Sequence, residues 1–325
     1  MKRSAASEIE DILYKNYLKF FQRAEEKRRW SIEKDVPWAL ANPESSDITA
    51  DIVQFFSAVE MYLPDYTAKM MHIIRASRGR AWFHLNWGYE ESKHSMVLEE
   101  WLLCSGKRTP EQVQDFANSL LDGKGWELPF DHPRQMMIYT MIQELATGLN
   151  YVHLRQRAQT ENDGALAGLL RWVAADESAH YHFYRSGVKA YLEREPEETI
   201  ADIRFVFSQF GMPGQALIPG WEQTSRSIDK AGIYGPRQYL QKVRDPILKH
   251  LNLTREQLKG AGIAPLEAEA MADTVEEQAA HEKLQSLCRT YSFSFQVKQL
   301  LPPKRLGMVR NDPVASLRSP QKTTE

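Results

Sequence analysis

Apolar residues recur at the spacing of an α-helix along nearly the whole chain. Alternating runs of Val, Ile and Thr bounded by Asn-Gly or Asp-Gly turns, which would indicate β-hairpins, are absent. The sequence therefore predicts an all-α protein. Four of the expected helices run for about 25 to 30 residues, against an average of about 11–12 in globular proteins. Helices of this length indicate a bundle whose members each run the full length of one core.

Residues that cap, interrupt or end helices mark the expected boundaries. Asp47 should cap the first turn of its helix, and Pro64 should kink that helix. Pro110 opens a short helix, and Asn162-Asp163-Gly164 makes the turn between two long ones. The expected helices cover residues 5–28, a long segment from Asp47, 78–104, a short segment from Pro110, 133–160 and 164–194.

Charge and composition exclude several classes of protein. The chain has 41 Lys and Arg against 43 Asp and Glu, whereas proteins that bind nucleic acid through its phosphates usually carry a basic excess. No stretch approaches the roughly 18 consecutive apolar residues of a membrane span. Cys104 and Cys288 are far apart and outside any CxxC spacing, and the first residues do not read as a secretory signal. We therefore expect a cytoplasmic protein that binds no nucleic acid and spans no membrane.

Two short motifs share the pattern acid-Glu-x-x-His. Residues three apart lie on one face of a helix, so the Glu and the His of each motif point the same way. A lone Glu stands on the helix before each motif, 31 residues ahead of the first motif's Glu and 33 ahead of the second's. The motifs are Glu90-Glu91-Ser-Lys-His94 and Asp176-Glu177-Ser-Ala-His180, and the lone residues are Glu60 and Glu144. Each half of the bundle therefore repeats one arrangement of acids and histidine.

Apolar residues surround the four Glu and two His at helical spacing, which places them on the inward faces of their helices. A buried carboxylate must be paired or bound to a metal, because an isolated buried charge costs many kcal/mol. Four Glu and two His form the ligand set of di-iron and di-manganese carboxylate bundles, and four carboxylates balance two divalent ions. The alternatives are a solvated charged face or buried Glu–Arg pairs, and no Arg falls at the matching positions of these helix faces.

The chain resembles the soluble acyl-acyl-carrier-protein desaturases of the ferritin-like superfamily. The resemblance rests on the two motifs, on Glu60-Met-Tyr-Leu-Pro-Asp-Tyr66 and on Gln143-Glu144-Leu-Ala-Thr147. It continues through residues 210–213, 234–240 and 293–300, and so covers about residues 5–301. It implies a ferritin-like four-helix bundle core with additional flanking helices, in one domain over residues 1–301 with the metal-binding bundle at about 48–195. We expect the polar residues 302–325 to form a disordered tail.

The resemblance implies an O2-dependent oxidoreductase of fatty acid biosynthesis. A reduced pair of iron ions would remove hydrogens from an unactivated methylene of a thioester-bound acyl chain and leave a double bond. The implied partners are acyl-carrier protein or coenzyme A as the acyl carrier, a ferredoxin-type electron donor and a second copy of the chain in a homodimer. The alternatives are a di-iron hydroxylase or N-oxygenase acting on another substrate, and an iron-handling ferroxidase or storage protein.

The resemblance also implies roles for the six metal-binding candidates. Glu60 and Glu144 would be terminal or bridging carboxylates. Glu91 and Glu177 would be shared between the two irons, and His94 and His180 would each bind one iron.

Four further residues receive roles from the resemblance. Thr147 lies one turn beyond Glu144 and would place its hydroxyl beside the oxygen-binding face, although it can equally bond the carbonyl of Gln143 within its own helix. Asp176 would accept a hydrogen bond from the free ring nitrogen of a ligand histidine. Trp30 would lie on the electron-entry side and Trp87 one turn before Glu91, although each tryptophan can also be plain core.

Two features bear on the substrate. Plant-type members carry basic residues before the histidine of the second motif, whereas this chain has Ser178-Ala179, which weakens the expectation of carrier-protein docking. The basic groups at residues 27–29 and at Arg75, Arg78 and Arg80 are candidate contacts for an acidic carrier. An acyl slot or ordinary core packing would each account for the methionines at positions 70, 71, 96, 136, 137 and 141.

Overall fold

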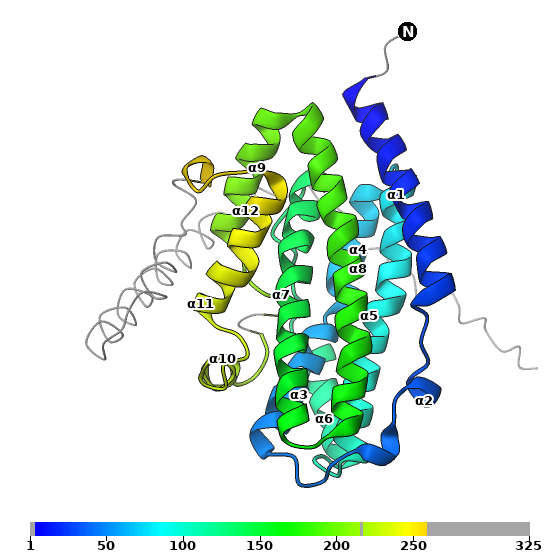
Figure 1. Ribbon diagram of the computed structural model, residues 1–325, viewed down its shortest axis with the longest axis vertical. Helices are drawn as coiled ribbons and strands as arrows, with labels where there is room; N and C mark the ends of the chain where they lie inside the picture. The colour runs from blue at the N-terminus through cyan, green and yellow to red at the C-terminus, as the bar shows by residue number, and fades with distance from the viewer. Residues whose placement is uncertain (1–3, 215–216, 259–325) are drawn as a thin grey trace, which may run out of the picture. The chain divides into compact units, whose positions relative to one another are not determined.

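The computed structural model of the chain describes residues 4–214 and 217–258. Every regular element within these residues is a helix, which confirms the all-α prediction (Figure 1). In chain order the elements are α1 (Ala5–Lys27), α2 (Ile32–Asp35), η1 (Trp38–Leu40), α3 (Asp47–Glu60), α4 (Leu63–Ile74), α5 (Arg78–Cys104), α6 (Pro110–Leu121), α7 (Pro133–Thr160), α8 (Gly164–Arg194), α9 (Pro196–Gln209), α10 (Trp221–Lys230), α11 (Pro236–Gln238), the π-helix η2 (Tyr239–Arg244), α12 (Asp245–Leu251) and η3 (Glu256–Leu258).

The four-helix core consists of α5, α7, α8 and the consecutive helices α3 and α4. α3 and α4 pack against α5, and α7 packs along α8. These two groups meet through contacts of α5 with α8 and of α4 with α7, which closes the bundle (Figure 1). α1 covers α5 and α8, while α9 and η2 lie against α7. The described residues therefore show the predicted four-helix core with flanking helices.

The first member of the bundle differs from its prediction. Instead of one kinked helix, α3 ends at Glu60 and α4 begins at Leu63, with Met61 and Tyr62 between them. Pro64 lies in the first turn of α4, where the absence of its N–H costs nothing because no helical carbonyl precedes it. The proline therefore starts a helix rather than bending one. Glu60 consequently stands at the last residue of α3, next to the break.

Helix starts in the rest of the bundle follow the expected chemistry, with one exception. The Asp163 carboxylate accepts a hydrogen bond from the Leu166 amide at 2.8 Å, which caps α8 directly after the predicted turn. α3 is capped by Ser46 and not by Asp47, because the Ser46 hydroxyl accepts from the Thr49 amide at 3.2 Å. The expectation that Asp47 forms this cap was wrong by one residue.

No helix in residues 4–214 and 217–258 has both the length and the apolar character that crossing a membrane requires. The likeness expected at residues 293–300 and the disordered tail expected at 302–325 lie outside the described residues. The boundaries of the single domain over residues 1–301 stay a prediction.

Candidate metal centre

The four-helix core brings the six predicted metal-binding side chains together at its centre. α3 carries Glu60, α5 carries Glu91 and His94, α7 carries Glu144, and α8 carries Glu177 and His180. None of the six is more than 4% exposed. Because the core helices are apolar around these positions, the carboxylates and imidazoles face one another and not the solvent.

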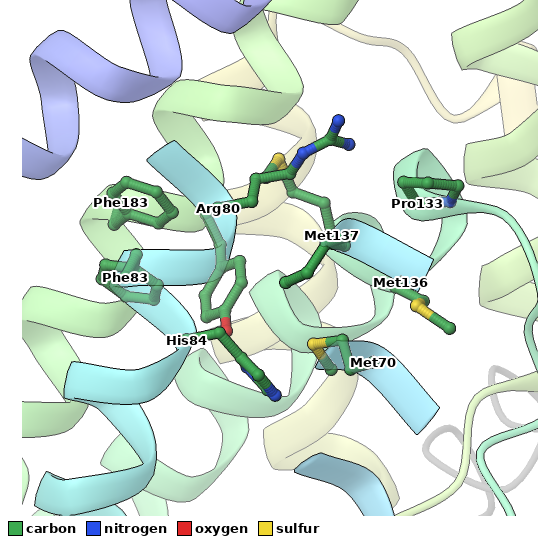
Figure 2. A pocket seen from close by; sticks show the side chains of 10 residues that line it. Met70, Arg80, Phe83, His84, Pro133, Met136, Met137 and Phe183 are labelled. Atoms are coloured by element: carbon green, nitrogen blue, oxygen red, sulfur yellow. The ribbon is translucent and has the colours of Figure 1, made fainter. Parts of the chain in front are cut away.

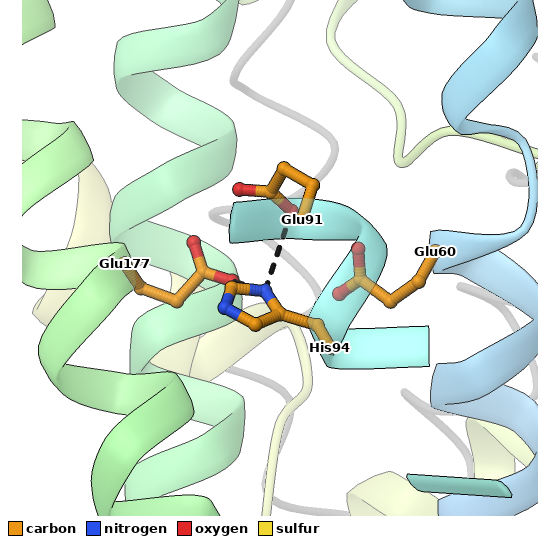
Figure 3. A group of neighbouring side chains, drawn as sticks. All are labelled: Glu60, Glu91, His94 and Glu177. Carbon is orange, nitrogen blue, oxygen red and sulfur yellow. Dashed lines mark ion pairs between the residues drawn. The ribbon is translucent and has the colours of Figure 1, made fainter. Parts of the chain in front are cut away.

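The six side chains form two overlapping groups of possible metal ligands. One group is Glu60, Glu91, His94 and Glu177, drawn in Figure 3, and the other is Glu91, Glu144, Glu177 and His180. Within each group the ligand atoms all lie within 4.8 Å of one another. Glu91 and Glu177 belong to both groups. This arrangement fits two ions held side by side with two shared carboxylates.

The contacts between these side chains leave polar atoms without partners. His94 Nδ1 lies 3.3 Å from Glu177 Oε1 and 3.4 Å from Glu91 Oε2. Neither His94 Nδ1 nor Glu177 Oε1 makes a hydrogen bond, although both are buried. His180 Nδ1 lies 3.0 Å from Glu91 Oε1 and 3.2 Å from Glu144 Oε2. Buried polar atoms without a partner are rare in proteins, so these atoms point to a bound cation.

Burial and mutual repulsion govern the charges of the cluster. Burial, with repulsion from Glu91, raises the pKa of Glu60 well above its usual value, and burial with repulsion from Glu177 does the same for Glu144. Burial disfavours the charged imidazole of His94, but Glu91 and the other acids outweigh it and raise the His94 pKa well above 6.5. The His180 pKa is raised in the same way. The metal-free cluster therefore holds protons that a bound cation would displace.

The first acid of each motif, Glu90 or Asp176, contacts the histidine of the other motif. These two residues are called the outer acids. Asp176 Oδ2 lies 3.4 Å from His94 Nε2, and Glu90 Oε2 lies 2.7 Å from His180 Nε2. A carboxylate only accepts hydrogen bonds, so each contact requires a proton on Nε2, while Nδ1 faces the inner carboxylates. Burial opposes ionisation of Asp176, but its hydrogen bond to His94 and the nearby cations lower its pKa to about 2.

Glu90 is a site residue that the sequence interpretation missed. Its signal was visible, because an acid precedes the Glu of both motifs, yet only Asp176 received a role. Arg28 and Arg29, which directly follow α1, contact Glu90. The buried Glu–Arg pairs considered as an alternative therefore exist, but they involve the outer acid and none of the four inner Glu residues.

Thr147 makes its expected helical bond and also approaches a carboxylate of the centre. Its hydroxyl oxygen lies 3.0 Å from the Gln143 carbonyl of its own helix and 3.1 Å from Glu177 Oε2 across the helix interface. A hydroxyl has one proton, so Thr147 can donate either to the Gln143 carbonyl or to the shared carboxylate of Glu177. Its role in oxygen chemistry stays a prediction.

The two tryptophans are buried and each donates to an acid of the centre. Trp30 Nε1 donates to Asp176 Oδ2 at 2.8 Å, and Trp87 Nε1 donates to Glu144 Oε1 at 3.0 Å. Tyr151, to which the sequence analysis gave no role, also donates its hydroxyl to Glu60 Oε1. The heptad spacing of Tyr151 from Glu144 places it on the inward face, and a buried tyrosine hydroxyl needs a partner. An inward tyrosine near the four Glu residues was therefore the sequence signal for this hydrogen bond.

A small pocket lies beside the centre, between α4, α5, α7 and α8. It is lined mainly by apolar side chains (Figure 2). Phe83 of this pocket packs edge-on against the His180 ring at 6.3 Å, which places the pocket about one helical turn from the metal-binding candidates. Met70, Met136 and Met137 line it, whereas Met96 is 48% exposed and faces away from any such slot.

The model of a family described as fatty acid desaturase matches residues 51–297. The chain is 26% identical over 185 residues to the DesA1 protein of Mycobacterium tuberculosis, which covers 54% of this chain and 53% of that protein. It is 26% identical over 172 residues to the acyl-[acyl-carrier-protein] 6-desaturase of Thunbergia alata, covering 51% and 43% of the two chains. The stearoyl-[acyl-carrier-protein] 9-desaturase 1 of Arabidopsis thaliana is also 26% identical, over 51% of this chain and 42% of that protein.

The chain spans about half the length of these relatives or less. The X-ray structure of DesA2 from Mycobacterium tuberculosis shares the fold, with a TM-score of 0.57 and 20% identity over 78% of this chain and 98% of that one. This likeness confirms the ferritin-like class of the helical core. The family match spans well over half of the sequence and includes all six inward Glu and His residues. The chain belongs to the fatty acid desaturase family.

Proposed function

We propose that this protein is a di-iron desaturase that uses O2 to introduce a double bond into a thioester-bound fatty acyl chain. The observation that carries the proposal is the pair of overlapping ligand groups, which share Glu91 and Glu177 in the buried centre of a chain of the desaturase family. When bound, two irons supply the chemistry of O2 activation and C–H oxidation that no protein side chain provides.

The chain's own residues would position that chemistry. Glu60 and His94 would hold one iron, Glu144 and His180 the other, and Glu91 and Glu177 both. Trp87 and Tyr151 donate to Glu144 and Glu60 and so orient the two unshared carboxylates. The Thr147 hydroxyl, 3.1 Å from Glu177, would hold or deliver a proton beside a shared carboxylate.

The pocket beside His180 would receive part of the acyl chain. Phe83, Phe183 and the methionines supply an apolar wall, and Arg80 is engaged by Glu10 and by the Tyr191 hydroxyl at 2.7 Å. Burial lowers the pKa of His84 to about 4, so this lining imidazole is neutral near pH 7. A wall of apolar and neutral groups suits a hydrocarbon and disfavours a charged ligand.

We propose acyl-carrier protein as the acyl carrier, with coenzyme A as the alternative, and a ferredoxin-type protein as the electron donor. The relatives named above are acyl-carrier-protein desaturases, which supports the first choice. The expected docking cluster is smaller than the sequence indicated, because Arg28 and Arg29 turn toward the buried Glu90. Arg75 is exposed and remains available to an acidic partner, whereas the Arg78 guanidinium stacks on the rings of Tyr14 and Trp82. We propose the cytoplasm as the compartment, since the sequence has only two cysteines, Cys104 and Cys288, which give no disulfide framework.

A second copy of the chain is the proposed partner of an apolar stripe on α5. Trp82, Leu85 and Tyr89 are 43–64% exposed and follow the three- and four-residue spacing of a helix-packing seam. The exposed Arg78 lies at the start of α5 and the exposed Glu100 near its end. Two antiparallel copies of α5 would bring these opposite charges together, as a twofold interface requires.

The test is an assay of the iron-loaded protein with ferredoxin, its reductase and acyl-carrier proteins bearing saturated chains of graded length, followed by mass spectrometry of the released acids. A product lighter by two hydrogens is expected, and parallel reactions with acyl-coenzyme A would identify the carrier. A product that gains one oxygen would assign the protein as a hydroxylase. Oxidation of iron without any change in the acyl chain would assign it to iron handling.

A further inference from the structure

One guanidinium contacts the outer acids of both motifs. Arg28 follows the end of α1, and its side chain is 12% exposed. Arg28 Nη1 and Nη2 donate to the two carboxylate oxygens of Glu90 at 3.1 and 3.0 Å. Arg28 Nη1 also donates to Asp176 Oδ1. Because Glu90 belongs to α5 and Asp176 to α8, Arg28 ties the two motif helices together.

Each of these acids contacts a histidine as well. Asp176 uses Oδ2 for His94 Nε2, while its Oδ1 accepts from Arg28. Glu90 uses Oε2 for His180 Nε2, and both of its oxygens accept from Arg28. Two connected paths therefore start at Arg28 and end at the two imidazoles of the candidate metal centre.

The two acids of this outer layer have protein cations as partners and do not depend on the metals for their pairing. Glu90 and Asp176 are each at most 2% exposed, and a buried carboxylate without a partner is strongly destabilising. Arg28 pairs with both acids and Arg29 with Glu90, and the buried Lys93 adds a further positive charge near them. The four inner Glu residues are thus left to the metal ions. An outer carboxylate that holds the second ring nitrogen fixes the tautomer and orientation of a ligand histidine.

Arg29 offers an internal comparison because it contacts only one of the two acids. Its Nη1 donates to Glu90 Oε1 at 2.5 Å, while its other nitrogens donate to Glu25 and Asn86 at 2.6 and 2.9 Å. It therefore supports the path to His180 and, among the described residues, makes no contact with Asp176.

We propose that Arg28 is a positioning residue for both histidines of the metal centre and that Arg29 is one for His180 alone. The inference rests on the proposed function, in which His94 and His180 each bind one ion. Arg28 touches neither the metals nor the substrate in this account. It acts through Glu90 and Asp176, which hold Nε2 of each imidazole so that Nδ1 points at the ions.

The test compares Arg28→Gln, Arg29→Gln and the exposed α1 control Arg23→Gln with the wild type. Anaerobic Co²⁺ titrations measure the affinity for each ion, and spectra of Zn²⁺-loaded, ¹⁵N-histidine-labelled protein report the Nε2–H signals of His94 and His180. Arg28→Gln should weaken both ions about 10- to 100-fold and shift both signals. Arg29→Gln should shift the His180 signal alone and weaken one ion by less than about tenfold. Arg23→Gln should change neither.

Wild-type Co²⁺ affinity and unchanged Nε2–H signals in Arg28→Gln would overturn the proposal, as would equal losses in Arg28→Gln and Arg29→Gln. If Arg28→Gln does not fold, Arg28→Lys keeps the charge but cannot span both acids, and it should still shift both histidine signals. Unchanged signals in Arg28→Lys would then overturn the proposal. Wild-type protein that binds fewer than two ions would instead overturn the proposed function, so the two failures are distinguishable.

Discussion

The α3–α5 half of the metal centre and the α7–α8 half carry the same sequence pattern but differ in their polar neighbours. In the first half, Tyr151 donates to Glu60, and His94 reaches its outer acid only at 3.4 Å. In the second half, Trp87 donates to Glu144, and His180 lies 2.7 Å from Glu90. The residue three beyond the lone Glu is Leu63 in the first half and Thr147 in the second. A repeated ligand pattern is thus compatible with two chemically distinct ion sites.

The largest expected effect is the loss of iron when the histidine of either half is removed. His94→Ala and His180→Ala should each lose at least one iron, because each removes one imidazole from one ligand group. His72→Ala, His84→Ala and His153→Ala should keep both irons, since none of these side chains belongs to either group. Metal analysis after anaerobic iron loading makes the measurement. An emptied site in His84→Ala together with a full one in His94→Ala would show that the assigned face of α5 is wrong.

The next prediction uses Thr147, which has no hydroxyl counterpart in the first half. Thr147→Val keeps the shape of the side chain but removes the hydroxyl near Glu177, so both irons should bind while turnover falls. Proton transfer by a positioned group is typically worth about 10²–10⁴-fold. Steady-state desaturation and iron content should be measured together, with Thr147→Ser as the control that restores the hydroxyl. Unchanged turnover in Thr147→Val would leave Thr147 with its helical bond to Gln143 alone.

A smaller effect concerns His84, seven residues before Glu91, where the second half has Leu170 before Glu177. Burial lowers the His84 pKa from 6.5 to about 4, so the unfolded chain binds more protons than the folded one between these values. The lowered His84 pKa therefore leaves the free energy of unfolding unchanged above pH 6.5 and reduces it as the pH falls toward 4. His84→Phe should abolish this decrease in the free energy of unfolding, which amounts to about 2 kcal/mol between pH 7 and 5.

Urea unfolding of the metal-free wild type and His84→Phe at both pH values makes this comparison. Other titrating groups contribute equally to both proteins and cancel in the difference. An identical pH dependence for the two proteins would show that His84 titrates normally in the fold. Leu170→Val is a matched control in the other half and should leave the pH dependence unchanged.

The sequence predicted those features that local rules determine. α5, α7 and α8 begin and end where Pro133, the turn at 162–164 and the hydrophobic period indicated. The six inward Glu and His residues followed from helical spacing together with the repeat of lone Glu, acid, Glu and His in each half, because a period of about 3.6 residues decides which side chains share a face. The break after Glu60 was not foreseen, since a proline in the first turn of a helix and a proline that kinks one leave the same sequence signal.

Local sequence rules could not predict the contacts of Arg28 and Arg29 with Glu90 and Asp176. Arg28 precedes Asp176 by 148 residues, and only the packing of α1 across α5 and α8 brings the two together. Arg28 and Arg29 lie beyond the end of α1 in a basic run that suggested a solvent-exposed docking surface, whereas the buried acids draw both inward. Tyr151 was missed for a related reason, because an aromatic ring at an inward position suggests packing before it suggests a hydrogen bond to Glu60.

The central claim is that the two halves together hold two metal ions, and the iron content of the purified chain tests it most directly. The wild type, loaded with Fe²⁺ under anaerobic conditions and freed of excess metal, should contain two irons per chain by elemental analysis. Four inward Glu and two His offer enough ligands for a pair and too much negative charge for a single divalent ion. A saturating content of zero or one iron per chain, in protein that is folded by circular dichroism, would contradict the account.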